Sequence, residues 1–451
     1  MFDIRTLLDD TYCAGTPEPA WACLEAEHAM DEAACMARWL PLAALDVGEA
    51  EQVRALATNA VLALRTQQPI FDVFSHLLQA YPLTTRAGCQ LMALAEALLR
   101  TSDTATAQAL LRDKLAGIDW VGEAGRVPAM DLAAIAQGLA SVARVTRLPG
   151  PDEKESLGHA LTRLVSEPVV LQGLRQGISG LAERFVMADT LEQALERADA
   201  DLQYGIGHSF DMLGEAVLTS ADAGICKDAY RHAIQVLGAN RRRYADGLLS
   251  LSLKLSALHP RLEATQYARI SELLLADVLS LLEQARAQGV AVTLDAEEND
   301  RLELQLRVLE RTLHSPGLRG WGGLGVAVQA YNRRAPAILG WLGRLSHACG
   351  CVIPVRLVKG AYWDSEVKLA QLRGLADYPV LTRKSATDVA YLGCARLLLG
   401  PALSARLRPR FATHNAHTSA AVIAMARRGG VSVEFEHLHG MGQDLHAYWR
   451  A

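Results

Sequence analysis

Residues 355–366 read VRLVKGAYWDSE, and this stretch decides the fold class. It continues an apolar run that begins at Cys351 and is interrupted only by Pro354 and Arg356. A short run of this composition is typical of a strand that is buried on both faces, as in a parallel sheet. A buried guanidinium needs a partner, because an unpaired charge in an apolar interior is very costly. The stretch therefore predicts a core strand whose arginine is paired.

Two interpretations of this strand end stay open from composition alone. Gly360 and Ala361 leave bare backbone where a flat molecule can approach, and Tyr362 and Trp363 lie beside it. Together with the preceding arginine and lysine, they are typical of the wall of a cofactor pocket. The alternative is a core strand whose two basic residues form structural ion pairs.

Composition bounds the class of protein. The chain has 451 residues, which suits two or three domains, and half of them are hydrophobic, as in an ordinary globular protein. A net charge of -5 argues against a nucleic-acid-binding chain. The eight cysteines are scattered, with Cys349 and Cys351 as the one close pair, so we expect reduced cytosolic thiols and no metal site.

The sequence predicts neither a signal peptide nor a membrane span. The first ten residues carry acids where a signal peptide needs an apolar core, and no run approaches the ~20 apolar residues of a span. We expect a soluble, cytoplasmic protein, and peripheral attachment to the inner membrane stays open.

Residues 1–188 are expected to form a helical arm and support domain. Apolar residues recur at helical spacing in residues 55–64 and 91–99, and residues 101–103 offer a break and an N-cap. No N-terminal DNA-binding module is evident, because no compact basic element precedes this region.

From residue 189 to residue 451, short strands alternate with amphipathic helices. The helical patterns include residues 267–288 and 302–313. The seven expected strands with their ends are residues 208–214, 251–257, 290–297, 325–331, 351–358, 410–415 and 433–440. This alternation predicts a parallel sheet with crossover helices, either a (β/α) barrel or an open doubly wound sheet.

The positions of the polar residues favour the barrel. In every expected strand they gather at or just past the C-terminal end, where barrel active sites lie. These residues are Asp211, Glu215, Lys254, Asp295, Glu297, Gln329, Tyr331, Arg356, Lys359, Thr413, His414, Glu436 and His439. A doubly wound sheet would concentrate them at one switch point, usually beside a glycine-rich loop. The chain has no GxGxxG after a strand and no P-loop motif.

In their order along the chain, these strand ends resemble the proline dehydrogenase domain of the bacterial proline utilization A family. The matching motifs are SFDMLGEA (209–216), LKLSALHP (253–260), DAEENDRLE (295–303), QAY (329–331), RLVKGAYWDSE (356–366), YPVLTRK (378–384), FATHNAHT (411–418) and LHGMG (438–442). The similarity extends to PLTTRAG (82–88), LAEALLR (94–100) and RDK (112–114) in the helical region. His208 departs from the family, where we expect an aromatic residue.

The resemblance implies FAD-dependent oxidation of L-proline to 1-pyrroline-5-carboxylate, with a hydride passing to flavin N5 and electrons to a membrane quinone. This is the first step of proline catabolism to glutamate. A fixed cation near N1/N5 favours the charge that develops there, and arginine suits the role because its charge does not titrate away. Whether the protein forms a homo-oligomer stays open.

Site residues follow from the resemblance, position by position. Arg356 would lie by the N5 edge of the flavin and Gln329 by its pyrimidine edge. The residues implied along the flavin and its ribityl-phosphate chain are Val358, Lys359, Gly360, Ala361 and Trp363. Those implied at the pyrophosphate and adenosine end are Thr382, Lys384, Thr413, His414 and Asn415.

The same resemblance implies that Lys254 binds the proline carboxylate, that Asp295 helps to form the substrate pocket, and that Tyr362 and Leu438 pack on the substrate ring. Lys254, Asp295, Tyr362 and Arg356 are thus the expected catalytic residues. Glu215 would support the substrate site by pairing with an arginine from a later helix. A plain ion pair of Asp295 with Lys254 or Arg356 is the alternative.

The expected barrel has eight strands, and only seven are recognisable, so we expect a fragment that lacks the eighth strand and the last helix. Weak or absent activity follows from this expectation. Two other functions stay open. One is a non-catalytic flavin-binding or interaction fragment of the same family, and the other is an unrelated barrel lyase using Asp295, Glu297 and His414 with a metal.

Overall fold

The computed structural model describes residues 4–9, 11–28, 30–66, 81, 85–90, 93, 106, 110, 186–212, 217–244 and 248–451. Contacts divide the chain into two units, one made of Met1–Leu64 with Asp189–Ala451 and the other of Arg65–Ala188. The expected division lay at residue 188. The structure differs at the N-terminus, because the first helices pack on the outside of the barrel. The helix expected at residues 91–99 and the break at 101–103 lie outside the described residues, apart from residue 93.

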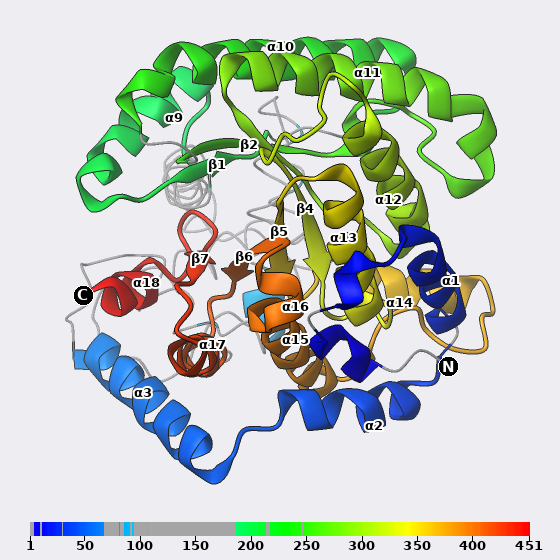
Figure 1. Cartoon of the computed structure of the whole chain (residues 1–451). Coiled ribbons are helices and arrows are strands. Elements are labelled where there is room, and N and C mark those ends of the chain that lie inside the picture. The colour runs from blue at the N-terminus through cyan, green and yellow to red at the C-terminus, as the bar shows by residue number, and fades with distance from the viewer. Residues whose placement is uncertain are drawn as a thin grey trace, which may run out of the picture. The chain divides into compact units, whose positions relative to one another are not determined.

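The sheet is built from parallel strands that pair in their sequence order (Figure 1). They are β1 (His208–Phe210), β2 (Leu249–Leu253), β3 (Ala291–Leu294), β4 (Leu324–Gln329), β5 (Ile353–Val358), β6 (Leu407–Ala412) and β7 (Glu434–Glu436). This order is that of a (β/α) barrel and confirms the expected fold class. Among the described residues, β1 and β7 are the two edges of the sheet.

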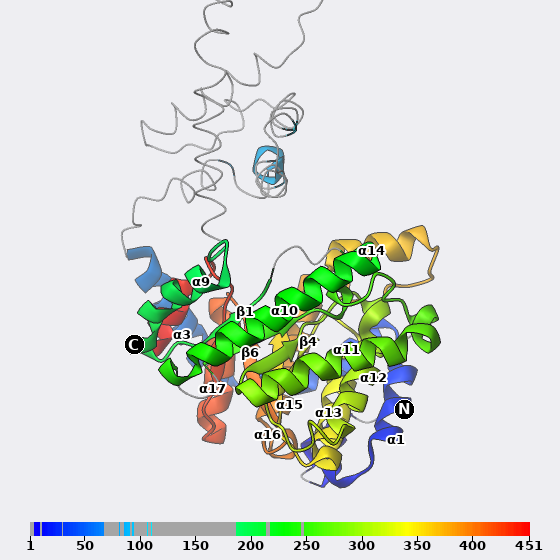
Figure 2. The same cartoon turned by 90° about the horizontal axis from the view of Figure 1, so that it is seen from above.

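Helices cover the outer face of the sheet (Figures 1 and 2). The longer ones are α9 (Leu191–Ala198), α10 (Ser220–Asn240), α11 (Tyr267–Gln288), α12 (Asn299–His314), α13 (Ala335–Cys349), α14 (Trp363–Leu372), α15 (Lys384–Leu399), α17 (Ala416–Gly429) and α18 (Gln443–Arg450). The short ones are η3 (Asp199–Tyr204), η4 (Arg241–Arg243), η5 (Leu255–Ala257), η6 (Ala264–Gln266) and α16 (Pro401–Ser404). The helix expected at 267–288 is α11, and the one at 302–313 lies within α12.

Local sequence explains where these helices begin and end. The α10 helix starts with a capping box, in which Thr219 and Asp222 bond each other's backbone N–H groups. The α11 helix ends at Gly289, whose φ of 69° is the left-handed conformation of a helix C-cap. In β5, Ile353, Val355 and Leu357 are fully buried, which is the core pattern that the sequence predicted.

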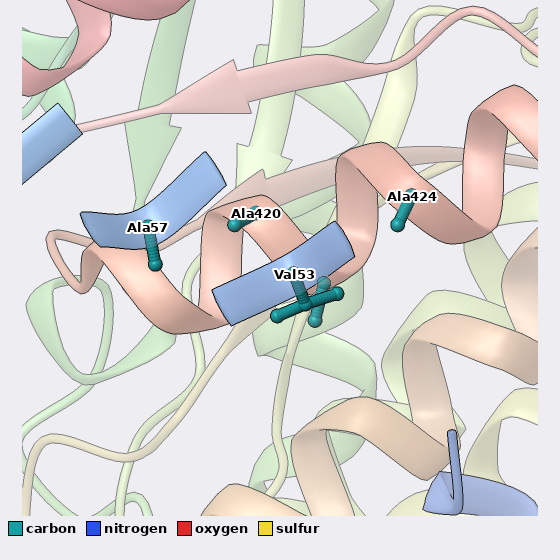
Figure 3. Close-up of a cluster of buried hydrophobic side chains, with 5 residues drawn as sticks. Val53, Ala57, Ala420 and Ala424 are labelled. Carbon is teal, nitrogen blue, oxygen red and sulfur yellow. The ribbon is translucent and has the colours of Figure 1, made fainter. Parts of the chain in front are cut away.

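The N-terminal arm consists of η1 (Ile4–Leu8), η2 (Tyr12–Ala14), α1 (Pro17–Glu27), α2 (Glu32–Ala43) and α3 (Val47–Thr66). The α1 helix packs on α13, where the rings of Trp21 and Trp341 lie 5.6 Å apart, and α2 packs on α15. Figure 3 shows α3 against α17, with Val53 and Ala57 facing Ala420 and Ala424. Small alanine side chains let these two helices approach closely. No helix among the described residues is long and apolar enough to cross a membrane.

Candidate functional site

Arg356 lies at the centre of the polar residues inside the sheet. Its Nη1 donates to Asp295 Oδ1 (2.6 Å) and to Ser252 Oγ (3.1 Å), and its Nη2 donates to Ser209 Oγ (2.9 Å). Its Nε donates to Glu436 Oε2 at 2.5 Å. These partners come from β1, β2, the end of β3 and β7. The sheet therefore curves enough for one side chain of β5 to reach both of its edges.

Lys254 follows β2 at the same end of the sheet. Its Nζ lies 2.6 Å from Asp211 Oδ1 and 3.8 Å from Asp295 Oδ2, and its side chain is 11% exposed. Its backbone N–H donates to the hydroxyl of Tyr230. The expected carboxylate-binding lysine is thus paired with carboxylates of the protein. Asp211 was noted as a polar residue at a strand end but was assigned no role. Its position just past β1, opposite Lys254 past β2, is the signal that could have identified it.

The charges in this cluster do not behave alike. Burial raises the pKa of Asp295 to about 6, and this effect outweighs the nearby Arg356, which lowers it. Burial also works against the charged form of Arg356, but Glu436 and Asp295 outweigh it and raise the pKa of that guanidinium. Arg356 is therefore a permanent cation, whereas the pKa of Asp295 lies at about 6. The structural ion pairs expected for this strand are present, and so is the grouping of polar residues at its end. The ion pairs therefore do not exclude a cofactor pocket at residues 355–366.

Two expected substrate residues lie at this face, and a third lies outside the described residues. Tyr362 is half-buried at the start of α14, and burial, with Glu297 and Glu298 nearby, raises its pKa to about 12. Its phenol therefore stays protonated. Leu438, in the loop after β7, is 63% exposed. Glu215 is the residue that the structure does not describe.

Gln329 connects two loops at the strand ends. Its Nε2 donates to the carbonyl of Glu297 (2.9 Å), and its Oε1 accepts the N–H of Ala361 (3.0 Å). The amide thereby keeps one N–H and one lone pair for a ligand. Next to it, Gly360 has a φ of 146°, and a Cβ there would lie 2.3 Å from Cδ2 of Tyr331. Only glycine allows this close approach of backbone and ring.

Beyond the end of β5, two cations share one carboxylate. Lys359 Nζ lies 2.5 Å from Asp388 Oδ1, and Lys384 Nζ lies 2.8 Å from Asp388 Oδ2. Lys359 also donates to Thr418 Oγ1 (3.1 Å) in the first turn of α17. Although burial raises the pKa of Asp388, the bonds from both lysines outweigh it and keep that pKa low. One positive charge is left uncompensated within this trio.

The residues between β6 and α17 bond mainly to one another. Asn415 caps α17 by accepting the N–H of Thr418, and Thr413 Oγ1 accepts the N–H of Asn415. His414 Nε2 accepts the N–H of Leu438 (3.1 Å), and burial lowers the pKa of this imidazole. Helix N-termini next to spare positive charge are suited to an anionic group such as a pyrophosphate.

Thr382, an expected cofactor residue, bonds to the arm. Its N–H and its hydroxyl both donate to Glu32 Oε2 of the arm, at 2.9 and 2.8 Å. Sequence reasoning missed this contact because 350 residues separate the partners and Glu32 belongs to no strand-end motif. Trp363, by contrast, is 41% exposed at the start of α14, and its Nε1 donates to the carbonyl of Leu381. Within the ranges that the structure describes, no group of three or more His, Cys, Asp or Glu side chains could hold a metal ion.

Two family models match the chain. One is described as "Proline dehydrogenase" and matches residues 194–451, and the other is described as "DNA-binding domain of Proline dehydrogenase" and matches residues 73–185. The second match corrects the expectation that no DNA-binding module is evident in the helical region. That expectation relied on the absence of a compact basic element, which the family match does not require.

Curated relatives match nearly the whole chain. It is 40% identical over 435 residues to the bifunctional protein PutA of Escherichia coli K12, which covers 94% of this chain and 32% of the relative. It is 41% identical over 380 residues to PutA of Rhizobium meliloti, covering 82% and 30%. The proline dehydrogenase of Deinococcus radiodurans is 27% identical over 290 residues, covering 63% and 83%. The chain spans about a third of the length of the PutA relatives.

Solved structures give the same picture. A crystal structure of a mutant Bradyrhizobium japonicum Proline Utilization A (PutA) matches with a TM-score of 0.69 and 39% identity, covering 94% of this chain and 42% of that one. A structure of PutA with proline bound in remote sites matches with a TM-score of 0.68 and 39% identity, with the same coverage.

Proposed function

Because this chain belongs to the proline dehydrogenase family, we propose that it oxidises L-proline to 1-pyrroline-5-carboxylate with FAD, and that a membrane quinone takes up the electrons. This would be the first step of proline catabolism to glutamate, in a cytoplasmic protein that reaches the inner membrane from its surface. The observation that carries the proposal is the cluster around Arg356, where Lys254 and Asp295 meet at the C-terminal ends of the strands.

The substrate side of the cluster suits a zwitterionic amino acid. A carboxylate would take the place of Asp211 on Lys254, and the substrate nitrogen would face Asp295 or the displaced Asp211. Tyr362 and Leu438 would pack on the apolar ring. Asp211 and Asp295 offer negative charge, and Lys254 and Arg356 offer positive charge, at the same end of the sheet. A small molecule with one charge of each sign is complementary to this arrangement.

The cofactor side lies between the ends of β4, β5 and β6. Gln329 and Arg356 would hold the isoalloxazine edges, and residues 358–363 would lie along the ring and its chain. Lys359 and Lys384, with the N-termini of α15 and α17, would hold the pyrophosphate. The lysines supply spare positive charge, and the first backbone N–H groups of a helix have no acceptor within the helix. The bound flavin would supply the hydride acceptor. Arg356 would keep a fixed positive charge beside it.

An absorbance scan of the purified protein, before and after anaerobic addition of L-proline, tests the proposal. We expect oxidised-flavin bands that bleach with proline. A Lys254→Ala variant should keep the bands but need at least tenfold more proline to bleach them, since a charge-assisted hydrogen bond to the carboxylate is lost. A colourless protein that gains no bands when FAD is added would contradict the proposal. Transfer of electrons to a soluble quinone analogue tests the acceptor.

A second candidate function is a flavin-binding module without turnover. The observation that favours it is the 2.6 Å ion pair of Lys254 with Asp211, which occupies the cation that the substrate needs. Flavin bands that do not bleach at any proline concentration would support this function against the first one.

A further inference from the structure

Residues 377–382 lead from α14 into α15 and end at Thr382. On the barrel side they are held by Leu381, whose N–H donates to the carbonyl of Tyr331 (2.8 Å). The carbonyl of Leu381 accepts the indole N–H of Trp363 (2.9 Å). Trp363 is expected to lie along the flavin. The position of residues 377–382 therefore helps to set the position of Trp363 beside the flavin.

The arm holds the C-terminal end of the same segment. Glu32 is the first residue of α2, whose N-cap Asp31 accepts the N–H of Ala34. The Oε2 atom of Glu32 accepts both the N–H and the hydroxyl of Thr382, at 2.9 and 2.8 Å. The start of α2 fixes the position of Glu32, and Glu32 in turn holds Thr382, which lies two residues before the start of α15.

The arm also holds the N-terminal end of the segment, through Arg333. This side chain follows β4 and is 2% exposed. Its Nη1 donates to the carbonyl of Met30 (2.9 Å), and Nη1 and Nη2 together bind both carboxylate oxygens of Asp377, at 2.5 and 2.9 Å. Bidentate arginine–carboxylate pairs are among the most directional contacts in proteins. Residues 30–32 of the arm are thus linked to both ends of residues 377–382.

The chemistry of Thr382 decides what this link does. A phosphate oxygen needs hydrogen-bond donors, and both donors of Thr382 are directed at one carboxylate oxygen of the protein. Thr382 therefore does not serve as an anion donor while Glu32 is in place. We infer that Glu32 is a positioning residue of the cofactor site: the arm holds residues 377–382, and through them Trp363 and the start of α15, in the arrangement that binds the flavin. This inference rests on the proposed flavin binding.

The test uses the full chain freed of flavin, with Glu32→Ala as the main variant. We expect the Kd for added FAD, measured by quenching of flavin fluorescence, to rise roughly tenfold, because two charge-assisted hydrogen bonds are lost. With both proteins free of flavin, the backbone amide of Thr382 should exchange its hydrogen faster in Glu32→Ala than in the unaltered chain. Thr382→Val should weaken FAD binding less, and the double variant should be no worse than Glu32→Ala alone.

Glu49→Ala is the matched control. Glu49 lies in the first turn of α3, accepts the N–H of Asp46 and pairs with Arg428 of α17 at 2.7 Å. Like Glu32 it joins the arm to the barrel, and it also lies 3.6 Å from Arg396 in the last turn of α15. Among the described residues, no bond connects it to residues 377–382. We expect this variant to unfold more easily, with FAD affinity and Thr382 exchange unchanged.

Three results would overturn the inference. Unchanged or tighter FAD binding by Glu32→Ala would mean that the glutamate is idle or competes with the cofactor. An equal loss in Glu49→Ala would mean that any loosening of the arm has the same effect. If hydrogen exchange at the Thr382 amide is the same in Glu32→Ala as in the unaltered chain, Glu32 does not hold residues 377–382 in place. If the unaltered chain binds no FAD, the proposed function fails, and the exchange measurement alone decides whether the arm holds the segment.

Discussion

Arg356 joins strands that are far apart in the sequence through one side chain. Its partners Ser209 and Glu436 stand on the two edge strands, and its 13% exposed guanidinium has a hydrogen-bond acceptor for Nε, Nη1 and Nη2. A buried cation with this set of partners stabilises one curvature of the sheet. The same cation supplies the positive charge that the proposed chemistry requires.

We expect Arg356→Met to lower the free energy of unfolding by about 3–5 kcal/mol, because it leaves the Asp295 and Glu436 carboxylates short of their main partner. Arg356→Lys should lose less, since it keeps the charge with fewer donors. Urea melts followed by circular dichroism measure the change. Arg311→Met is the control, because Arg311 pairs with the exposed Glu272 and should cost less than about 1 kcal/mol. Equal losses in the two methionine variants would contradict this account.

Asp295 makes the stability of the protein depend on pH with a defined sign. Burial raises its pKa to about 6 in the folded chain, against about 3.9 in an unfolded chain. The fold therefore favours the protonated acid, and this stabilisation is complete below about pH 4 and is lost as the pH rises through about 6.

Asp295→Asn, which resembles the neutral acid, should gain stability relative to the unaltered chain between about pH 4 and pH 7. The gain should reach roughly 2–3 kcal/mol, since each pKa unit corresponds to about 1.4 kcal/mol. Urea midpoints of both proteins across this range check the sign. A difference between the two proteins that stays constant with pH would show that Asp295 does not titrate in this range.

At the scale of elements, the strand-to-helix connections carry the candidate site. The turn after β5 illustrates the constraint, because Gly360 brings its backbone against the ring of Tyr331 while Ala361 bonds to Gln329. A motif of glycine followed by alanine indicated bare backbone at this point. The positive φ and the contacting ring became visible only when β4 and β5 were placed side by side.

Gly360→Ala should weaken FAD binding and lower stability by more than the about 1–2 kcal/mol that a positive φ costs an ordinary residue, because its Cβ would also meet Tyr331. Gly374→Ala is the control. Gly374 has a φ of 63° with nothing within 4 Å of its Cβ position, so it carries the backbone cost alone. FAD titrations and thermal melts of both variants separate the two effects. An equal effect of both changes on FAD binding would argue against the close approach at Gly360.

On the scale of the whole molecule, the arm ties together helices that the sheet alone does not connect. Its α1, α2 and α3 helices contact α13, α15 and α17 in turn. The carbonyl of Met30 accepts a hydrogen bond from Arg333, and Glu49 forms ion pairs with Arg396 and Arg428. This explains why Met1–Leu64 form one unit with Asp189–Ala451, whereas the expected helical domain ran from residue 1 to residue 188. Helical periodicity predicted a helix at residues 55–64, which lies within α3, but could not say on which part of the chain it packs.

Sequence alone determined the seven strands, their alternation with helices and the gathering of polar residues at the strand ends. It also carried the resemblance that the family models and relatives bear out. These features are local, because side-chain periodicity and strand-end chemistry are written in runs of a few residues. Strand boundaries moved by a few residues, as in β2, which begins at Leu249 rather than at residue 251.

Only the tertiary structure decided the partners. The pairing of Lys254 with Asp211, the reach of Arg356 to both sheet edges and the contact of Glu32 with Thr382 all depend on how the sheet curves and where the arm lies. A charged residue in a sequence has many candidate partners of opposite charge, and the short range of a hydrogen bond selects among them only after folding. Short stretches of sequence therefore determine which residues lie at the site, whereas the hydrogen bonds and ion pairs between them depend on the tertiary fold.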